Sequence, residues 1–250
     1  MKHKNTWMRS VLCGLAACML LPLSICGCDG SEKSDYDYEI DIDDYLDAIT
    51  VDDEDYLILA NKDEPLGRKY KPDDLATLDR DLTLDGKKIR LEATAALAVE
   101  ALVLELWECG YEDIRVTSGY RDYDYQKSLF YTYMDNERKS HPDLDDDEIE
   151  EIVLTYSARP GTSEHQTGLC VDLISTEHLA LDVSFEDNPA FEWLTENAHH
   201  FGFILRYPED MEDVTGYSYE PWHYRFVGVK AATEIYEGEM VLEEYLEELD

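Results

Sequence analysis

The sequence predicts an α+β domain in which helices pack around a small antiparallel sheet. Runs with apolar residues at helical spacing cluster in the first half of the chain, whereas short runs rich in β-branched and aromatic residues cluster in the second half. Segregated helices and strands are typical of α+β folds, while a parallel sheet requires strict alternation of the two. The chain has 250 residues and no internal repeat, so once its ends are discounted one domain with a full core accounts for it.

The first half of the domain is predicted to hold three helices and one strand. In residues 90–107, Leu91, Ala95, Ala98, Leu102 and Leu106 recur at helical spacing, and the following Gly110 ends the pattern. Residues 113–117 alternate apolar and polar side chains and predict a strand that leads into a loop at 118–121. Further helices are expected over 124–137 and, with an acidic first turn, over 143–157.

The second half is predicted to supply most of the sheet. A loop over 161–167 should lead into a strand over 169–174, followed by a helix that begins at Asn188 or Pro189, runs to His200 and ends at Gly202. Strands are then expected over 203–207 and 219–227. An acidic helix over 229–249 closes the chain.

Residues 1–28 have the layout of a secretory signal. A basic start precedes an apolar run over 11–25, and small residues close the segment. The closing Ile25-Cys26-Gly27-Cys28 resembles a bacterial lipobox, which implies lipidation of Cys28 and a lipoprotein on the extracellular face of the cell membrane. A plain cleaved signal and an uncleaved N-terminal helix are the alternatives.

Residues 29–55 are dominated by acids, with Lys33 as the single basic residue, and predict a solvated tether that leads to a folded domain over 56–250. The whole chain carries 58 acidic and 21 basic residues and a formal net charge of −37. Such a charge disfavours nucleic acid and anionic membrane surfaces as partners. Membrane contact is therefore expected through the N-terminal lipid anchor only.

Three residues have the chemistry of metal ligands, and a carboxylate lies close to them in the sequence. They are His165, Asp172 and His223, with Glu220 three residues before the last. Two imidazoles and one carboxylate leave a tetrahedral Zn²⁺ with one open position, as catalytic zinc sites require. Taken singly, each is as readily an ordinary surface or core residue. Pro221 favours an extended backbone at Glu220, so Glu220 can reach the same site as His223 only through a turn or bulge.

Two cysteines, Cys109 and Cys170, lie in the predicted domain. In an exported protein they could pair, although buried free thiols are equally compatible with the sequence. Cys170 precedes Asp172 by two residues and should share its face of the strand, which could bring the thiol near the metal. We leave it out of the ligand set because a fourth protein ligand would close the catalytic position.

Several separated motifs follow one another along the chain: Leu59-Ala60-Asn61-Lys62, Ser118-Gly119-Tyr120-Arg121 with Gln126, the stretch 163–172, the stretch 202–208, and Glu220-Pro221-Trp222-His223. In this order they resemble the VanY-type D-alanyl-D-alanine carboxypeptidases, which are zinc peptidases of bacterial cell-wall metabolism. The resemblance implies a zinc site at the mouth of the sheet with His165, Asp172 and His223 as ligands and Glu220 as the general base. It further implies that Arg121 binds the substrate carboxylate or stabilises the oxyanion, and that Gln126 and Ser163 add hydrogen bonds. Cys170 departs from the family, which usually has a small residue such as alanine at this position.

The resemblance implies a zinc-dependent D,D-carboxypeptidase that removes the terminal D-alanine from peptidoglycan stem peptides. An L,D-carboxypeptidase acting on tetrapeptide stems shares the same motifs, and a wall-binding module without turnover is a further alternative. The sequence leaves the oligomeric state open.

Overall fold

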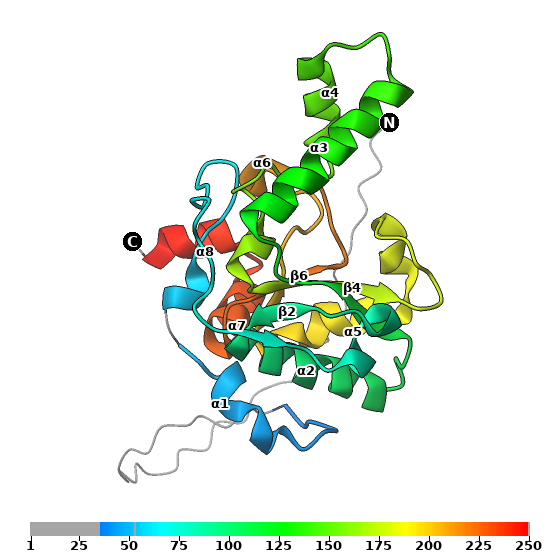
Figure 1. Ribbon diagram of the computed structural model, residues 1–250. Helices are drawn as coiled ribbons and strands as arrows, with labels where there is room; N and C mark the ends of the chain where they lie inside the picture. The colour runs from blue at the N-terminus through cyan, green and yellow to red at the C-terminus, as the bar shows by residue number, and fades with distance from the viewer. Residues whose placement is uncertain (1–35, 53, 250) are drawn as a thin grey trace, which may run out of the picture. The chain divides into compact units, whose positions relative to one another are not determined.

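The computed structural model describes residues 36–52 and 54–249, and these form an α+β unit built on a four-stranded antiparallel sheet (Figure 1). The sheet has the order β3-β4-β6-β5, from β3 (Ile114–Ser118), β4 (Cys170–Ser175), β6 (His223–Phe226) and β5 (Phe203–Leu205). A two-stranded sheet joins β1 (Leu75–Thr77) to β2 (Arg90–Glu92). The predicted fold class is confirmed.

Helix α2 (Ala93–Glu108) forms the centre of the main core. The Glu92 side chain caps it by accepting hydrogen bonds from the backbone N–H groups of Thr94 and Ala95, and its apolar stripe, from Ala95 to Leu106, is fully buried. The predicted helix therefore exists, but it begins three residues later because residues 90–92 pair with β1. Figure 1 shows α2 and α5 (Pro189–Asn197) on the same side of the sheet.

Helices α3 (Tyr123–Ser140) and α4 (Asp146–Val153) form an arm that projects from the opposite side of the sheet (Figure 1). The arm has its own small core, made by Phe130, Met134, Ile149 and Val153. Helix α4 is shorter than the predicted helix over 143–157. Asp145 forms a capping box with Glu148 and fixes its start, and turns replace the helix after Val153.

The C-terminal half contains short elements joined by tight turns. Helix α5 continues into a 3-10 turn over Ala198–Phe201 and ends at Gly202, as predicted, with φ +79°. Strands β5 and β6 are shorter than the expected ranges 203–207 and 219–227, and a short helix, α6 (Glu212–Thr215), lies between them. The expected single helix over 229–249 is two helices, α7 (Val229–Gly238) and α8 (Leu242–Leu249), because Glu239 adopts a left-handed conformation with φ 52°.

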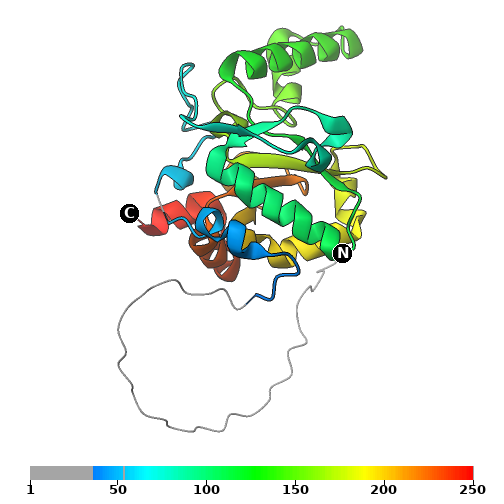
Figure 2. The same cartoon turned by 60° about the horizontal axis from the view of Figure 1, so that its bottom comes forward.

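Residues 36–52 differ from the expected tether, because they pack on the folded unit. They include a 3-10 turn (Ile42–Asp44) and α1 (Leu46–Ile49), which lies against α2 (Figure 2). Ile49 is fully buried, and the buried carboxylate of Glu105 accepts hydrogen bonds from the N–H groups of Glu39 and Ile40. The apolar residues interspersed among the acids therefore suffice to anchor this segment.

The predicted signal segment, including Cys28, lies outside the described residues. Within the described ranges, no helix combines the length and the apolar character needed to cross a bilayer.

Candidate active site

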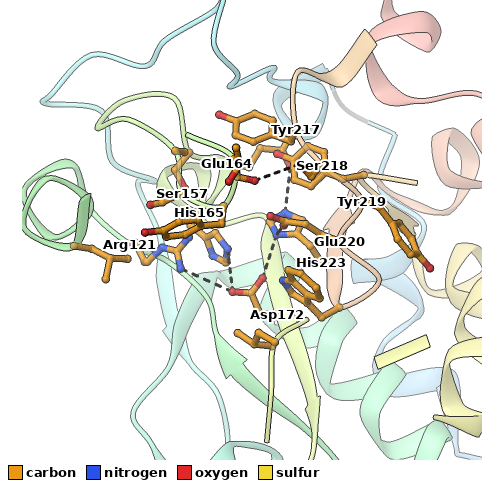
Figure 3. A pocket seen from close by; sticks show the side chains of 18 of the residues that line it. Arg121, Ser157, Glu164, His165, Asp172, Tyr217, Ser218, Tyr219, Glu220 and His223 are labelled. Atoms are coloured by element: carbon orange, nitrogen blue, oxygen red, sulfur yellow. Dashed lines mark hydrogen bonds and ion pairs between the residues drawn. The ribbon is translucent and has the colours of Figure 1, made fainter. Parts of the chain in front are cut away.

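The register of the sheet brings the three predicted metal ligands together. Asp172 on β4 pairs directly with His223, the first residue of β6. His165 comes from a 3-10 turn (Glu164–Thr167) that precedes β4, and Gly168, with φ +72°, turns the chain from it into the strand. One carboxylate oxygen of Asp172 lies 3.3 Å from His165 Nε2 and the other lies 3.1 Å from His223 Nδ1 (Figure 3).

The neighbouring groups orient both imidazoles toward Asp172. His165 Nδ1 lies 2.7 Å from the carbonyl oxygen of Gly119, so it donates its proton there and leaves the Nε2 lone pair facing Asp172. On the other ring, His223 Nε2 faces Glu164 Oε2 at 3.6 Å, and neither of these two buried atoms has a hydrogen-bond partner. A proton on His223 Nε2 would therefore leave Nδ1 free on the side of Asp172.

The electrostatics of this cluster favour positive charge between its members. Burial acts to raise the pKa of Asp172, but His165 and His223 outweigh it and hold that pKa well below its usual range. Burial and Arg121 act to lower the pKa of His165, whereas Asp172 raises it to about 9. The two imidazoles and the carboxylate are thus arranged to stabilise positive charge between them. A divalent cation such as zinc would supply that charge at the centre of the cluster.

Glu220 reaches the cluster through a turn, as the sequence predicts for a side chain that shares a site with His223. The N–H of His223 donates to the carbonyl of Glu220 at 3.1 Å, closing a turn over Pro221 and Trp222, and the N–H of Glu220 donates to the carbonyl of Tyr207 at 3.0 Å. As a result, Glu220 Oε2 lies 3.5 Å from His223 Nδ1. Burial raises the pKa of Glu220 to about 7, although His223 acts in the opposite direction.

Arg121 and Ser163 line the same cavity as the cluster, whereas Gln126 does not. The backbone N–H of Arg121 donates to the carbonyl of His165, and its guanidinium Nη1 lies 3.2 Å from Ser118 Oγ and 3.9 Å from Asp172 Oδ2. Gln126 is buried, and its Nε2 donates to the carbonyl of Ala158 at 2.8 Å. The expectation that Gln126 faces the substrate therefore differs from its position, in which it holds the segment that forms one wall of the cavity.

The cavity has a volume of about 280 Å³, and tyrosine and tryptophan side chains form part of its wall. Helix α3 and the chain after α4 contribute to it, so the arm flanks the opening. The aromatic lining residues are Tyr133, Tyr156, Tyr207, Tyr217, Tyr219 and Trp222. Arg121 is the only lysine or arginine among the described residues that line it, and it therefore marks the place for a negatively charged group.

A buried ion-pair network supports the site from behind. Glu164 Oε1 accepts hydrogen bonds from Arg206 Nε at 2.7 Å and from Arg225 Nη1 at 2.8 Å, and all three side chains are fully buried. Arg206 also binds both carboxylate oxygens of Glu243 on α8. Burial acts to raise the pKa of Glu164, but the two guanidinium groups lower it overall.

Sequence reasoning missed this network. Arg225 lies between Tyr224 and Phe226 in a strand that is otherwise rich in aromatic residues, and that pattern could have indicated a buried, paired arginine. No comparable signal marks Glu164, which simply precedes His165.

Both cysteines of the described chain are free, so the possible Cys109–Cys170 pair is excluded there. Cys109 is half-buried and Cys170 is buried. Cys170 lies on β4 beside the cluster, on the face of Asp172, as predicted.

Comparisons with known proteins find similarity to carboxypeptidases. The sequence profile of the VanY D-alanyl-D-alanine carboxypeptidases matches residues 88–229. The carboxypeptidase-like protein YodJ of Bacillus subtilis (strain 168) is 39% identical over 78% of this chain and 68% of its own length. A D-alanyl-D-alanine carboxypeptidase of Enterococcus faecalis (strain ATCC 700802 / V583) is 34% identical over 76% of this chain, which spans 65% of that protein.

Several solved structures are similar to this fold. The LdcB LD-carboxypeptidase is 36% identical with a TM-score of 0.66, over 79% of this chain and 89% of its own. A mutant of the vancomycin-resistance D,D-pentapeptidase VanY, in complex with Zn(II), is 34% identical with a TM-score of 0.64, over 77% of this chain and 99% of its own.

Proposed function

The chain belongs to the VanY family of D-alanyl-D-alanine carboxypeptidases, and we propose on that premise that it is a zinc-dependent D,D-carboxypeptidase of peptidoglycan stem peptides. The observation that carries the proposal is the convergence of His165, Asp172 and His223, with Glu220 Oε2 3.5 Å from His223, in one cavity with Arg121. A cation site, a proton acceptor and a carboxylate receptor in one cavity are what hydrolysis at a free C-terminus needs.

His165, through Nε2, His223, through Nδ1, and Asp172 would hold the zinc ion. When bound, zinc lowers the pKa of water and polarises a carbonyl oxygen. The protein's part is to fix the ligands. The Gly119 carbonyl holds the His165 tautomer, and Glu164 lies where it can hold that of His223.

Glu220 would move the proton. Its carboxylate accepts a proton from the attacking water, whose oxygen then bonds to the carbonyl carbon of the scissile amide. As the C–N bond breaks, Glu220 returns the proton to the departing amine, so that free D-alanine and a shortened stem result. A carboxyl group whose pKa is about 7 is suited to both transfers near neutral pH.

Arg121 would bind the terminal carboxylate of the substrate, since its guanidinium is 23% exposed and is the one lysine or arginine side chain of the described cavity lining. Ser163 lines the cavity and would add a hydrogen bond. Gln126 would contribute indirectly, through the wall that it holds.

An L,D-carboxypeptidase acting on tetrapeptide stems is the second candidate, and the similarity to the LdcB LD-carboxypeptidase supports it. The two activities differ in the bond that is cleaved. Incubation with a pentapeptide stem and a tetrapeptide stem, followed by mass spectrometry of the products, separates them. Loss of D-alanine from the pentapeptide alone supports D,D activity, and loss from the tetrapeptide alone supports L,D activity.

We further propose that the chain is exported and anchored through a lipid on Cys28, as its lipobox-like segment suggests. This places the proposed active site outside the membrane, where stem peptides occur. Metabolic labelling with a radioactive fatty acid should mark the wild type and leave Cys28→Ala unlabelled. Equal labelling of both would contradict the proposal.

Glu220 provides the test of catalysis. Glu220→Gln should lower kcat for D-alanine release by about 10²–10⁴-fold, because the proton acceptor is lost. Its zinc content should be unchanged, since Glu220 is not among the proposed ligands. Glu209→Gln, at an exposed carboxylate, is the matched control. Wild-type protein that binds stem peptide and zinc but releases no D-alanine would instead identify a wall-binding module.

A further inference from the structure

Cys170 lies among the donor atoms of the proposed zinc site. One ring nitrogen of His165, one ring nitrogen of His223 and the sulfur of Cys170 all lie within 4.8 Å of one another, and all three residues are buried. The two imidazoles are those that contact Asp172. Two overlapping sets of three ligands therefore share the same pair of histidines.

The surroundings offer the thiol few other polar partners. Cys170 is fully buried and free, and the residues on either side of it, Leu169 and Val171, are apolar. Two imidazoles and a thiol that lie close together and buried are of the residue types that bind soft cations.

The distances are compatible with ligation. Bonds of about 2.1 Å to nitrogen and 2.3 Å to sulfur in a tetrahedral zinc site separate these ligand atoms by about 3.6 Å. The largest separation here is 4.8 Å at most, so the donors would have to close by no more than about 1.2 Å. Side-chain rotation at a cysteine and two histidines supplies a displacement of that size.

We propose that Cys170 is a further metal ligand of this site, contrary to the ligand set expected from the sequence, so that its thiolate joins His165, His223 and Asp172 around a thiophilic divalent cation. The inference rests on the metal site of the proposed function and adds a sulfur ligand to it. A thiolate in the fourth position would compete with water for the cation, and it would favour cations that prefer sulfur, such as Co²⁺ or Cd²⁺ over Mg²⁺ or Ca²⁺.

Cobalt reports sulfur ligation directly, because a Co²⁺–thiolate bond produces a charge-transfer absorption band in the near ultraviolet that oxygen and nitrogen ligands do not. The full chain, stripped of metal and kept reduced, is titrated with Co²⁺ to one equivalent. The wild type is compared with Cys170→Ala, with Cys170→Ser as a second variant of nearly equal size. Cys109→Ala is the matched control, and the remaining cysteines are common to all four proteins.

We expect the wild type to show the charge-transfer band of one Co²⁺–thiolate bond and each Cys170 variant to lack it. The spectrum of Cys109→Ala should equal that of the wild type. Identical spectra of the wild type and the Cys170 variants, with one Co²⁺ bound in each, would overturn the inference while leaving the zinc site in place. Failure of the proposed function is distinguishable, because it would show in the D-alanine assay, as no release or as release that does not depend on metal, whatever the spectrum.

Discussion

Removal of the Glu164 carboxylate should destabilise the protein strongly. Glu164→Ala would leave Arg206, which is fully buried, paired only with Glu243, and would leave Arg225, also fully buried, with backbone carbonyls as its only partners. Removing one partner from a buried ion pair costs about 3–5 kcal/mol because the remaining charge is uncompensated. For a chain of this size, each kcal/mol lowers Tm by about 2–4 °C, so the expected fall is about 6–20 °C.

The assay is thermal unfolding followed by circular dichroism at pH 7, in the presence of a chelator so that metal binding does not contribute. Glu164→Gln keeps an acceptor oxygen and should fall between Glu164→Ala and the wild type. Glu247→Ala, at an exposed carboxylate on α8, should leave Tm unchanged. A Tm of Glu164→Ala within about 2 °C of the wild type would show that the Glu164 network does not stabilise the back of the site.

Three further outcomes follow from single residues. Arg121→Lys should lower kcat/KM for a stem with a free terminal carboxylate by about 10–100-fold, since a charged hydrogen bond contributes about 1.5–3 kcal/mol. An unchanged kcat/KM in steady-state kinetics would contradict the role of Arg121. Gly202→Ala should lower the free energy of unfolding in urea by about 1–3 kcal/mol, because φ is +79° and a Cβ would lie 2.7 Å from Phe226 Cε2. Gly67→Ala, with open space around the added Cβ, should change it by less than about 0.5 kcal/mol. Equal effects of the two substitutions would argue against backbone strain at Gly202. Burial, assisted by His200, lowers the pKa of His199 to about 4, so the unfolded chain binds the proton first and stability should fall as the pH drops from about 6.5 to about 4. In His199→Phe, which can keep the stacking on Tyr236, this loss of stability should be smaller by about 1–2 kcal/mol after allowance for solvent screening. If the stability of the wild type and the variant depends on pH in the same way, His199 is not the cause.

The sequence predicts the elements whose patterns are long or punctuated. Helix α2 has an uninterrupted apolar stripe, and the end of the segment from α5 to Phe201 is marked by Gly202. The turn at Glu220 was inferred as a requirement, because an extended Glu220-Pro221-Trp222-His223 could not place both side chains on one face, and the structure contains it. Local chemistry therefore constrains much of the candidate site.

Long-range pairing is what the sequence does not reveal. The acids of residues 36–52 suggested solvation, but the apolar residues between them bury against α2 and Glu105 satisfies their backbone N–H groups. Glu164 is buried only because two arginines from β6 and the chain after β5 reach it. Gln126 likewise finds its partner at Ala158, which no local pattern indicates.

Zinc-dependent release of D-alanine is the deciding measurement for a zinc carboxypeptidase. The purified protein is stripped of metal with a chelator, titrated with Zn²⁺, and assayed on a defined pentapeptide stem by mass spectrometry. We expect no D-alanine release before zinc is added. In the wild type, release should rise linearly with added zinc and saturate at one equivalent, and His165→Ala should show no such rise. Release that continues undiminished after complete removal of zinc would contradict it.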